Sequence, residues 1–452
     1  MQTKMWNPVA FGLGLTIALC STQVGAQTTS DRFVPFAEFI QSVRTAASTQ
    51  YVGAAQARVS STSAFNEMRQ HLLRMYDSIH VGHSYVLDSQ YFDCVPINEQ
   101  PSVRLLGLRN VETVPPRPSQ PAGGGAGRAP DGSEPAVQVR PDQKADRFGN
   151  SIPCEAGTIP MRRITLEELS RFTSLREFFQ KGPGGAGQVP FKEGFGRAIT
   201  SHKYAHAYQN VANHGGASFL NLWNPKVDTT QGEIFSLSQY WYANYRGDGK
   251  VQTVEGGWQD YPGKYGVTKP VLFIYWTADG YNATGCYNLD CAGFVQTNSA
   301  ISLGATFSNY STKGGTQYDF RLQWEVFPDS GGRWWLYYGG GGAADAVGYY
   351  PSSLFSSGPL GTAASSIDYG GETVGSTVWP PMGSGKFPGK GFGYAAFQRF
   401  IYYVLAAGGA SYATLTPSQP SPTCYKIKVF NNSSDPNYHT HFYFGGRGGT
   451  GC

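Results

Sequence analysis

The chain has 452 residues, which is enough for two or three domains of about 150 residues each. Only 15% of the residues are charged, against roughly 25% in typical soluble domains, whereas aromatic residues reach 14% and glycines number 58. This composition favours short strands and tight turns, and the net charge of +4 without clustered Lys or Arg excludes a nucleic-acid groove and a membrane-binding face.

The first 26 residues have the pattern of a secretory signal. Lys4 precedes an apolar stretch that ends near Ala18, and small residues lead to a predicted cleavage after Ala26. The apolar stretch is shorter than the roughly 18 residues of a membrane helix, and no later segment reaches that length. A lipoprotein site at Cys20 is the alternative, but Leu19 is bulky where a small residue is expected. We therefore expect a secreted protein, extracellular or periplasmic.

Six cysteines remain after the signal, and an even number in an exported chain favours disulfides. Six cysteines allow fifteen connectivities in principle. The layout along the chain favours the pairs Cys94–Cys154, Cys286–Cys291 and Cys424–Cys452. A metal site is the alternative, but the sequence has no CxxC pair and no histidine at zinc-finger spacing, so we expect no metal.

Residues 27–202 contain two stretches with helical periodicity. The first, 62–79, places apolar side chains on one face, at Phe65, Met68, Leu72, Tyr76 and Ile79. The second, 165–179, begins with Thr165 and Glu168 at the spacing of a capping box and continues with apolar residues. The sequence predicts one amphipathic helix in each stretch.

Two Pro- and Gly-rich stretches interrupt this region. The insertion near 112–142 has too few apolar residues to order itself by burial, which predicts a flexible linker. The joint at residues 181–196 follows the second predicted helix and is expected to be exposed to proteolysis.

From Lys203 onward the chain consists of short runs that alternate polar with β-branched or aromatic residues. The runs lie at 217–225, 235–245, 271–280, 293–307, 318–327, 332–340 and 395–404. Period-two alternation, broken by Gly, Asn and Pro, predicts a mainly β protein with an antiparallel sandwich or barrel. The helical crossovers that a parallel βαβ fold requires are missing from the pattern.

Two glutamates have near mirror-image settings in this carboxylate-poor chain. Glu255 precedes two glycines in VEGGWQ, and Glu372 follows two glycines in DYGGETV. In a strand beginning at Val251, Thr253 and Glu255 share one face, and the glycines would let a peptide backbone approach closely. An isolated glutamate in a strand is more often a solvated side chain, so the pair is a hypothesis at this point.

Aromatic and amide side chains near these glutamates are candidates to bind a peptide or a sugar. They are Trp258, Gln259, Tyr275, Trp276 and Tyr369, with Tyr281 as a further polar helper. No GxSxG nucleophile elbow and no complete phosphate loop occur. His439 and His441 share a strand face, but they lack a third ligand nearby and packing explains them more simply than a metal.

Several long motifs resemble, in order, the neprosin family of secreted glutamic peptidases. They are GGASFLNLWNP, FSLSQYWY, VEGGWQ, YWTADGYNATGCYNLDCAGFVQTN, YPSSLF, DYGGETV and MGSGKFPGKGFGYAAFQR, and YFDCVPINEQPS is similar to part of the family's activation peptide. The resemblance covers roughly residues 86–102 and 203–452. Two departures from plant members are the Pro/Gly insertion, which leaves the processing site open, and Gly256, where those members tend to have Ala.

The resemblance implies a β-sandwich peptidase that cuts after proline, with Glu255 and Glu372 as its catalytic pair and with disulfides at Cys286–Cys291 and Cys424–Cys452. It divides the chain into a signal peptide at 1–26, a pro-segment at 27–202 with the insertion near 112–142, and a catalytic β-sandwich at 203–452.

We expect a monomeric zymogen that matures in acid and acts on proline-containing peptides, with no cofactor and no nucleic-acid or membrane partner. The alternative is a carbohydrate-binding or glycoside-hydrolysing β-sandwich, because paired carboxylates and exposed aromatic side chains also suit sugars.

Overall fold

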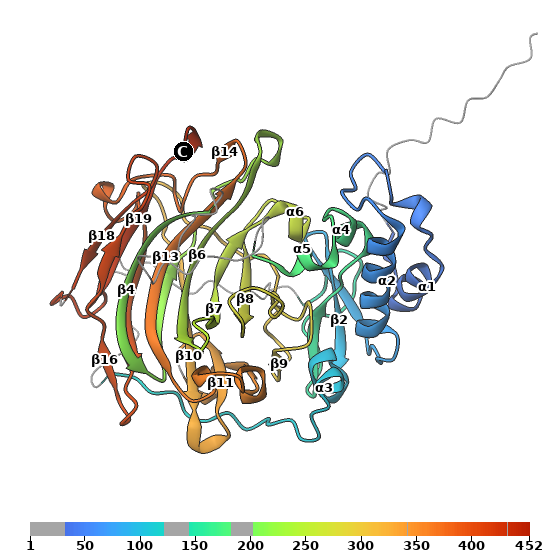
Figure 1. Ribbon diagram of the computed structural model, residues 1–452, viewed down its shortest axis with the longest axis horizontal. Coiled ribbons are helices and arrows are strands. Elements are labelled where there is room, and N and C mark those ends of the chain that lie inside the picture. Colours follow the sequence, from blue (N-terminus) through green and yellow to red (C-terminus); the bar gives the residue numbers. More distant parts are fainter. Residues whose placement is uncertain (1–31, 122–143, 182–201, 341, 432) are drawn as a thin grey trace, which may run out of the picture. The chain divides into compact units, whose positions relative to one another are not determined.

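Two large antiparallel sheets form the part of the chain from residue 202 onward, and the fold is mainly β as predicted (Figure 1). The computed structural model describes residues 32–121, 144–181, 202–340, 342–431 and 433–452. The predicted signal at 1–26, most of the predicted insertion and residues 182–196 of the joint lie outside these described residues. The elements between Pro35 and Cys452 belong to one packed unit, and the division at residue 202 stays a prediction about maturation.

One sheet has six strands in the order β17-β4-β13-β6-β7-β8. Their bounds are β4 His202–Asn213, β6 Glu233–Tyr245, β7 Val251–Asp260, β8 Val271–Thr277, β13 Ala364–Gly375 and β17 Thr416–Ser418. The central strands β6, β7 and β13 are buried along nearly their whole length. Strands covered on both faces have no solvent side, which is why aromatic and apolar residues dominate them.

The second sheet has nine strands in the order β18-β19-β15-β5-β10-β11-β12-β9, with β16 paired to β15. Their bounds are β5 Gly215–Asn221, β9 Val295–Gln296, β10 Asp319–Phe327, β11 Arg333–Tyr338, β12 Ala346–Tyr350, β15 Ala396–Val404, β16 Ala410–Tyr412, β18 Lys426–Phe430 and β19 His441–Gly445. A separate pair joins β14 Val378–Trp379 to β20 Gly449–Thr450. Helix α6, Pro262–Tyr265, follows β7.

Aromatic side chains fill the space between the two large sheets. The indole Nε1 of Trp258 on β7 donates to the carbonyl of Asn221 on β5 at 2.9 Å, and a Cβ at Gly256 would lie 3.1 Å from Nε1 of Trp324 on β10. Even-numbered residues of β7 and β10 therefore face the inter-sheet core. Because side chains alternate along a strand, odd-numbered residues of both strands face outward from the sandwich.

The described residues between 35 and 181 add a small sheet and five α-helices (Figure 1). The sheet has the order β1-β2-β3. The bounds are α1 Phe36–Thr45, α2 Thr62–Tyr76, α3 Pro101–Leu105, α4 Leu166–Ser170, α5 Leu175–Phe179, β1 Ser84–Leu87, β2 Gln90–Pro96 and β3 Thr158–Arg162. Helix α2 confirms the first helix prediction: Ser61 caps its N-terminus, and the predicted apolar face is buried as far as Tyr76.

The stretch 165–179, predicted as one helix, forms α4 and α5 instead. Thr165 and Glu168 make the predicted capping box at the start of α4. The hydroxyl of Ser174 then accepts a hydrogen bond from the backbone N–H of Glu177, which starts a second helix. A further correction concerns 293–307, where only Val295–Gln296 forms a strand.

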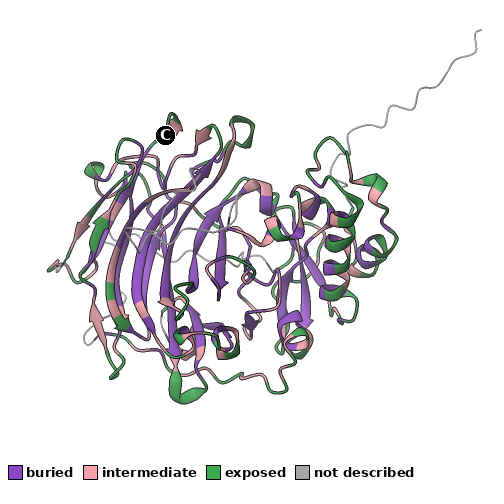
Figure 2. Ribbon diagram, viewed as in Figure 1, coloured by how far each residue is buried: buried purple, intermediate pink, exposed green. Residues whose placement is uncertain are grey.

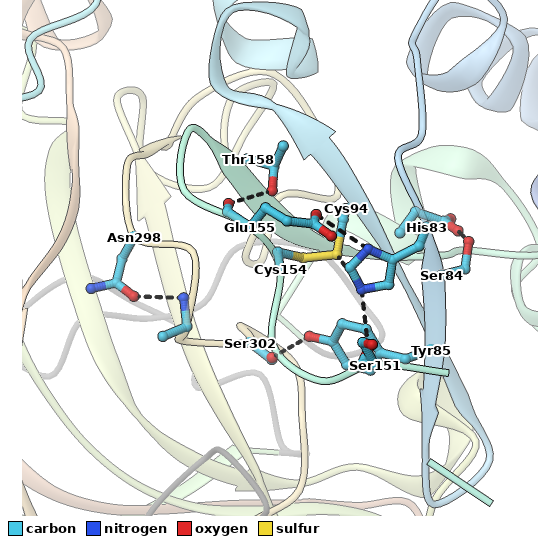
Figure 3. Close-up of a disulfide and its surroundings, with 12 residues drawn as sticks. His83, Ser84, Tyr85, Cys94, Ser151, Cys154, Glu155, Thr158, Asn298 and Ser302 are labelled. Carbon is cyan, nitrogen blue, oxygen red and sulfur yellow. Dashed lines mark hydrogen bonds and ion pairs between the residues drawn. A yellow bond between two sulfur atoms is a disulfide. The ribbon is translucent and has the colours of Figure 1, made fainter. Parts of the chain in front are cut away.

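Three disulfides join the predicted cysteine pairs, Cys94–Cys154, Cys286–Cys291 and Cys424–Cys452. In Figure 3, the ring of His83 lies beside the first of them, with Nε2 3.4 Å from Cys94 Sγ and Nδ1 3.3 Å from the carboxylate of Glu155. This bond ties β2 to the chain that returns after residues 122–143. In each of the three disulfides, both cysteines lie on the same side of residues 182–201 in the sequence.

The buried residues gather in the strands of the large sheets, whereas exposed residues gather on α1, α2 and the loop tips (Figure 2). Among the helices that the structure describes, none is both long and apolar enough to cross a bilayer.

Residues 112–121, here called the strap, make specific contacts, which corrects the expectation of a flexible linker for this part of the insertion. The strap continues from the segment after α3 and passes β11 on its way toward β16 (Figure 1). Its backbone bonds to side chains of the nine-stranded sheet, as at Ser119, whose N–H donates to Glu325 at 2.8 Å. Hydrogen bonds to the main chain order a segment that has little apolar surface to bury.

Candidate active site

Glu255 on β7 and Glu372 on β13 lie on one face of the six-stranded sheet, with β6 between them. In register, Glu255 pairs with Trp241 and Glu372 pairs with Leu237. Directly paired residues of antiparallel strands share a face, so Gln239 lies midway between the two glutamates. This face is opposite the inter-sheet core, yet the glutamates are only 0% and 1% exposed.

Lys181 joins the two carboxylates. Its Nζ lies 2.6 Å from Glu255 Oε2 and 3.1 Å from Glu372 Oε2, and it donates to Gln239 Oε1 at 2.7 Å. The same Nζ is 5.7 Å from the ring centroid of Trp241. Because one ammonium group contacts both carboxylates, the two acids are within a few ångströms of each other.

Two hydroxyl groups hold the other oxygen of Glu255. Its Oε1 accepts hydrogen bonds from Thr253 at 2.8 Å and from Tyr281 at 2.6 Å. Tyr281 has a left-handed backbone, with φ of 61°, in a loop whose N–H groups at 282–284 donate to the carboxylate of Asp279. This loop and the adjacent disulfide fix the tyrosine hydroxyl over the sheet.

Glu372 has a different set of partners. Its Oε1 lies 2.6 Å from His202 Nδ1 and accepts from the Tyr204 hydroxyl at 3.3 Å, and its Oε2 accepts from the Gln239 amide at 3.1 Å. His202 and Tyr204 come from β4, which pairs with β13 on the side away from β6. Glu372 is therefore contacted from both neighbouring strands and from Lys181.

Burial and the lysine act in opposite directions on the acid–base groups. Burial alone would raise the pKa of Glu372, but Lys181 and His202 outweigh it and lower that pKa to about 2. Burial likewise disfavours the charged form of Lys181, but the two carboxylates raise its pKa. Burial and the Glu255 carboxylate raise the pKa of Tyr281 well above its usual value, so its hydroxyl stays a donor.

Residues 176–181 of the predicted pro-segment cover the glutamate face. Besides the contacts of Lys181, the carbonyl of Phe179 accepts from the Tyr275 hydroxyl at 3.2 Å, and Arg176 donates to the carbonyl of Tyr281 at 3.2 Å. Tyr275 and Tyr281 also stack on each other, with ring centroids 5.9 Å apart. The chain before residue 182 therefore occupies the space over the carboxylates.

Some of the predicted neighbours share the face of the glutamates. Tyr275 pairs directly with Glu255 across β7 and β8. Gln259 lies on the same face four residues beyond Glu255, and its amide donates to Tyr287, not to either glutamate. Of the predicted polar helpers, Tyr281 contacts the pair and Gln259 does not.

Three of the predicted substrate-binding side chains, Trp258, Trp276 and Tyr369, face the inter-sheet core and not the glutamates. The hydroxyl of Tyr369 bonds with that of Tyr242 at 2.9 Å, and the Trp276 ring packs edge-on against Phe355. Trp258 and Tyr369 are each three residues from a glutamate, and an odd spacing along a strand places side chains on opposite faces.

The glycines beside the glutamates serve packing, which corrects the expectation that they open the site. A Cβ at Gly257 would lie 2.0 Å from the carbonyl oxygen of Ser238, and one at Gly370 would lie 2.5 Å from that of Ala205. At Gly371, a Cβ would lie 2.6 Å from the sulfur of Met382. These positions require glycine because neighbouring strands and the second sheet approach closely.

Sequence reasoning missed Lys181, Gln239, Trp241, His202 and Tyr204. No local motif marks them, because they lie on other strands or, for Lys181, beyond a helix of the predicted pro-segment. The alternation along β6 indicates that Gln239 and Trp241 share a face, but only the strand register shows that this is the face of the glutamates.

Among the residues that the structure describes, no group of three His, Cys, Asp or Glu side chains is placed to hold a metal ion. His439 and His441 pack against aromatic rings: His439 stacks on Tyr412 at 4.0 Å and His441 on Phe430 at 4.8 Å. Packing therefore accounts for both histidines.

Comparison with known proteins gives two matches. Residues 232–447 match the family model described as Neprosin. Among solved structures, the chain is similar to scytalido-glutamic peptidase with a transition state analog inhibitor, at 10% sequence identity and a TM-score of 0.29, over 55% of this chain and 100% of that chain. The family match contains Glu255, Glu372, Gln239 and Tyr281. Residues 232–447 of the chain are therefore similar to the neprosin family.

Proposed function

We propose that the protein is a glutamic-type endopeptidase, with Glu255 and Glu372 as its acid–base pair. The match of residues 232–447 to the Neprosin family model supports a peptidase. The observation that carries the proposal is the convergence of two buried carboxylates on one atom, Lys181 Nζ. A pair of acids this close is suited to share a proton once the ammonium is gone.

The chemistry follows from that shared proton. The ionised carboxylate takes a proton from a water molecule, whose oxygen attacks the scissile carbonyl. The protonated partner donates a hydrogen bond to the carbonyl oxygen and stabilises the oxyanion that develops on it. The amide of Gln239, between the two acids, orients the water or the carbonyl, and the leaving nitrogen receives the proton held by the pair.

The preference for proline before the cut is part of the same proposal. Trp241 shares the glutamate face, and Lys181 Nζ lies 5.7 Å from its ring centroid, so an aromatic surface borders the carboxylates. Tyr275 provides a second ring on this face. A flat apolar proline ring packs well against such rings, which replaces the predicted roles of Trp258, Trp276 and Tyr369.

We further propose that the chain is a zymogen in which Lys181 blocks the glutamates. The ammonium and the main chain of 176–181 occupy the space that a substrate needs. No described disulfide crosses residues 182–201, so one cut in that segment leaves the preceding segment without a covalent link to the sheets. Cleavage there is consistent with release of the block.

Acid weakens this block. With Lys181 in place the pKa of Glu372 is about 2, below the ordinary value of 4.5. The stabilisation that Glu372 contributes to Lys181 docking is complete above about pH 4.5 and is lost as the pH falls toward 2. Acid also supplies the single proton that the catalytic pair needs.

The test is to hold the purified precursor at a series of pH values and follow chain length on a gel together with cleavage of a proline-containing peptide. We expect acid to yield a product near the mass of residues 202–452 and peptide fragments that end in proline. Equal cleavage by full-length precursor at pH 7 would contradict the zymogen, and cuts without enrichment for proline would contradict the specificity. Reducing-sugar release from a polysaccharide panel without peptide cleavage would favour a glycoside hydrolase instead.

A further inference from the structure

The outer face of the nine-stranded sheet carries a polar network that has no part in the glutamate site. On β10, Arg321, Gln323 and Glu325 alternate with core residues and face outward. Arg321 donates to Gln323 Oε1 at 2.8 Å, and the Gln323 amide donates to Glu325 Oε2 at 2.9 Å. Arg321 also donates to the Tyr402 hydroxyl at 2.5 Å. These side chains are all less than 5% exposed.

The network recognises the main chain of the strap. Glu325 accepts the backbone N–H of Ser119 at 2.8 Å and its hydroxyl at 2.7 Å. The carbonyl of Ser119 accepts from the Gln323 amide at 2.8 Å and lies 3.1 Å from the Tyr402 hydroxyl. Most of these contacts involve backbone N–H and carbonyl groups, which every peptide carries. The face therefore binds an extended backbone and does not select a particular side chain.

Aromatic residues extend the same face along the strap. The Tyr337 hydroxyl donates to the carbonyl of Pro116 at 2.9 Å, and the Tyr349 hydroxyl accepts the N–H of Glu112 at 3.0 Å. Tyr337 and Tyr349 are each 1% exposed and pack with Trp335. Tyrosine-lined surfaces that bond carbonyl groups are typical sites for extended proline-rich chains.

The strap sequence fits this surface. Its run VPPRPSQP contains four prolines, of which Pro118 and Pro121 are buried, whereas Arg117, directly before Pro118, is exposed. Proline restricts the chain to the extended form before binding, so little entropy is lost when it docks. The contacts thus depend on prolines and backbone groups, not on the charge of Arg117.

We propose that this outer face is a second peptide-binding site, for proline-rich chains in extended conformation, which the strap occupies in the precursor. The hydrogen bonds among Arg321, Gln323, Glu325 and Tyr402 do not involve the strap, so the site is pre-organised for another chain of the same chemistry. The proposal rests on the proposed function in one respect: a proline-containing substrate takes the place of the strap after the pro-segment leaves. A distant second contact would hold such a substrate while the glutamates cut it.

The raised pKa of Glu325 is consistent with a site in which uncharged groups of the strap, the N–H and hydroxyl of Ser119, donate to this carboxylate. Burial raises the pKa of Glu325 to about 7, and hydrogen bonds from Ser119 and Gln323 and the charge of Arg321 offset only part of this rise. Tyr337, Tyr349 and Tyr402 are further titratable groups on this face, and burial raises the pKa of each. Peptide binding that buries Glu325 is therefore expected to strengthen as the pH falls from 7 toward 4.5.

The experiment uses the full chain with Glu255→Gln, so that bound peptide is not cut. A fluorescein-labelled synthetic peptide with the sequence of residues 112–121 is titrated by fluorescence anisotropy against this parent and against a chain that also carries Pro116→Gly and Pro118→Gly in the strap. The tethered strap competes at a high effective concentration in the parent, so we expect at least about tenfold tighter binding to the strap-weakened chain. Ser119→Pro, which removes the N–H that Glu325 accepts, gives a second route to a weakened strap if the glycine variant does not fold.

Matched peptides and site variants decide the assignment. In the strap-weakened chain, the double substitution Gln323→Ala and Glu325→Ala should reduce peptide affinity at least about tenfold, because it removes the side chains that hydrogen-bond to Ser119. A peptide with Pro118→Ala should bind more weakly than the original, whereas one with Arg117→Ala should bind within about twofold, because Arg117 is exposed in the strap.

Three results would overturn the proposal: no binding to either folded strap-weakened chain, equal binding to the Gln323 and Glu325 variant, or equal binding of the Pro118→Ala peptide. Anisotropy does not depend on peptide cleavage. Failure of this site is therefore distinguishable from failure of the proposed peptidase activity, which is measured by cleavage in the chain with Glu255 intact.

Discussion

The two outer faces of the sandwich each bury a carboxylate against the region before residue 182, and the two carboxylates titrate in opposite directions. On the six-stranded sheet, Glu372 meets the ammonium of Lys181, and its pKa falls to about 2. On the nine-stranded sheet, Glu325 meets the hydroxyl and N–H of Ser119, and its pKa rises to about 7. Both are almost fully buried and both accept several hydrogen bonds.

The difference teaches that a full positive charge in contact, more than the number of hydrogen bonds, decides whether a buried carboxylate stays ionised. It also gives the two faces opposite responses to acid. Lowering the pH from 4.5 weakens the contact of Glu372 with Lys181, whereas lowering it from 7 favours the buried, protonated form of Glu325 under the strap. The proposed maturation in acid is therefore expected to begin at the glutamate pair.

The largest expected effect concerns Glu255 and Glu372, whose charge the proposed mechanism uses. Glu325 differs from them because its charge is disfavoured by burial. Glu255→Gln and Glu372→Gln should each lower turnover by about a hundredfold to ten-thousandfold, because each removes acid–base catalysis. Peptide cleavage by acid-matured protein is the measurement, with circular dichroism as the control for folding.

The double variant should be little worse than either single one, since residues that act as a unit are not additive. Near-normal turnover in a folded single variant would remove that glutamate from the mechanism.

The second prediction removes the cation. Lys181→Met leaves two buried carboxylates without a counter-ion and should lower the free energy of unfolding of the precursor by about 3–5 kcal/mol at pH 7. The loss should shrink near pH 4, where protonation relieves the repulsion. Denaturant unfolding at both pH values measures it. Lys269→Met is the matched control: its pair with Asp88 is exposed, so it should cost only about 0–1 kcal/mol.

The third prediction neutralises the acid under the strap. The folded pKa of Glu325, about 7, lies above the ordinary 4.5, so the stability that its protonated form contributes is complete below pH 4.5 and is lost as the pH rises through 7. Between pH 5 and pH 8 the wild-type chain should lose about 2–3 kcal/mol more than Glu325→Gln, which has no charge to bury. Glu67→Gln, at an exposed position on α2, should keep the wild-type pH dependence. If the free energy of unfolding depends on pH in the same way in wild type and Glu325→Gln, the pKa of this carboxylate is not raised in the folded chain.

The smallest expected effect concerns a single hydroxyl at the glutamate pair. Tyr281→Phe removes the donor 2.6 Å from Glu255 and should lower turnover by about tenfold, the value of one hydrogen bond to a charged group. Tyr310→Phe, whose hydroxyl donates to the carbonyl of Pro270, tests the same loss away from the glutamates. An equal effect of both variants on turnover would remove Tyr281 from the site.

Much of the fold could be predicted because it depends on local patterns. The period-two runs became β5, β6, β8, β10, β11 and β15, the apolar stripe at 62–79 became α2, and the three cysteine pairs formed as their layout indicated. The long predicted strand at 293–307 and the single helix at 165–179 were wrong. In the second case a local signal was present: Ser174 is itself an N-cap, and a second cap divides a helix.

By itself, the sequence singled out Glu255 and Glu372, through their mirrored settings, as the proposed catalytic pair, and it indicated the strand character around them. Only the tertiary structure decided which side chains meet those glutamates. Alternation says which residues share a face within one strand, but strand order and register decide which strands are neighbours, and these depend on contacts between residues far apart in sequence. Gln239 reaches the glutamates through β6, Lys181 through the segment before residue 182, and Glu325 meets Ser119 across 206 positions of sequence.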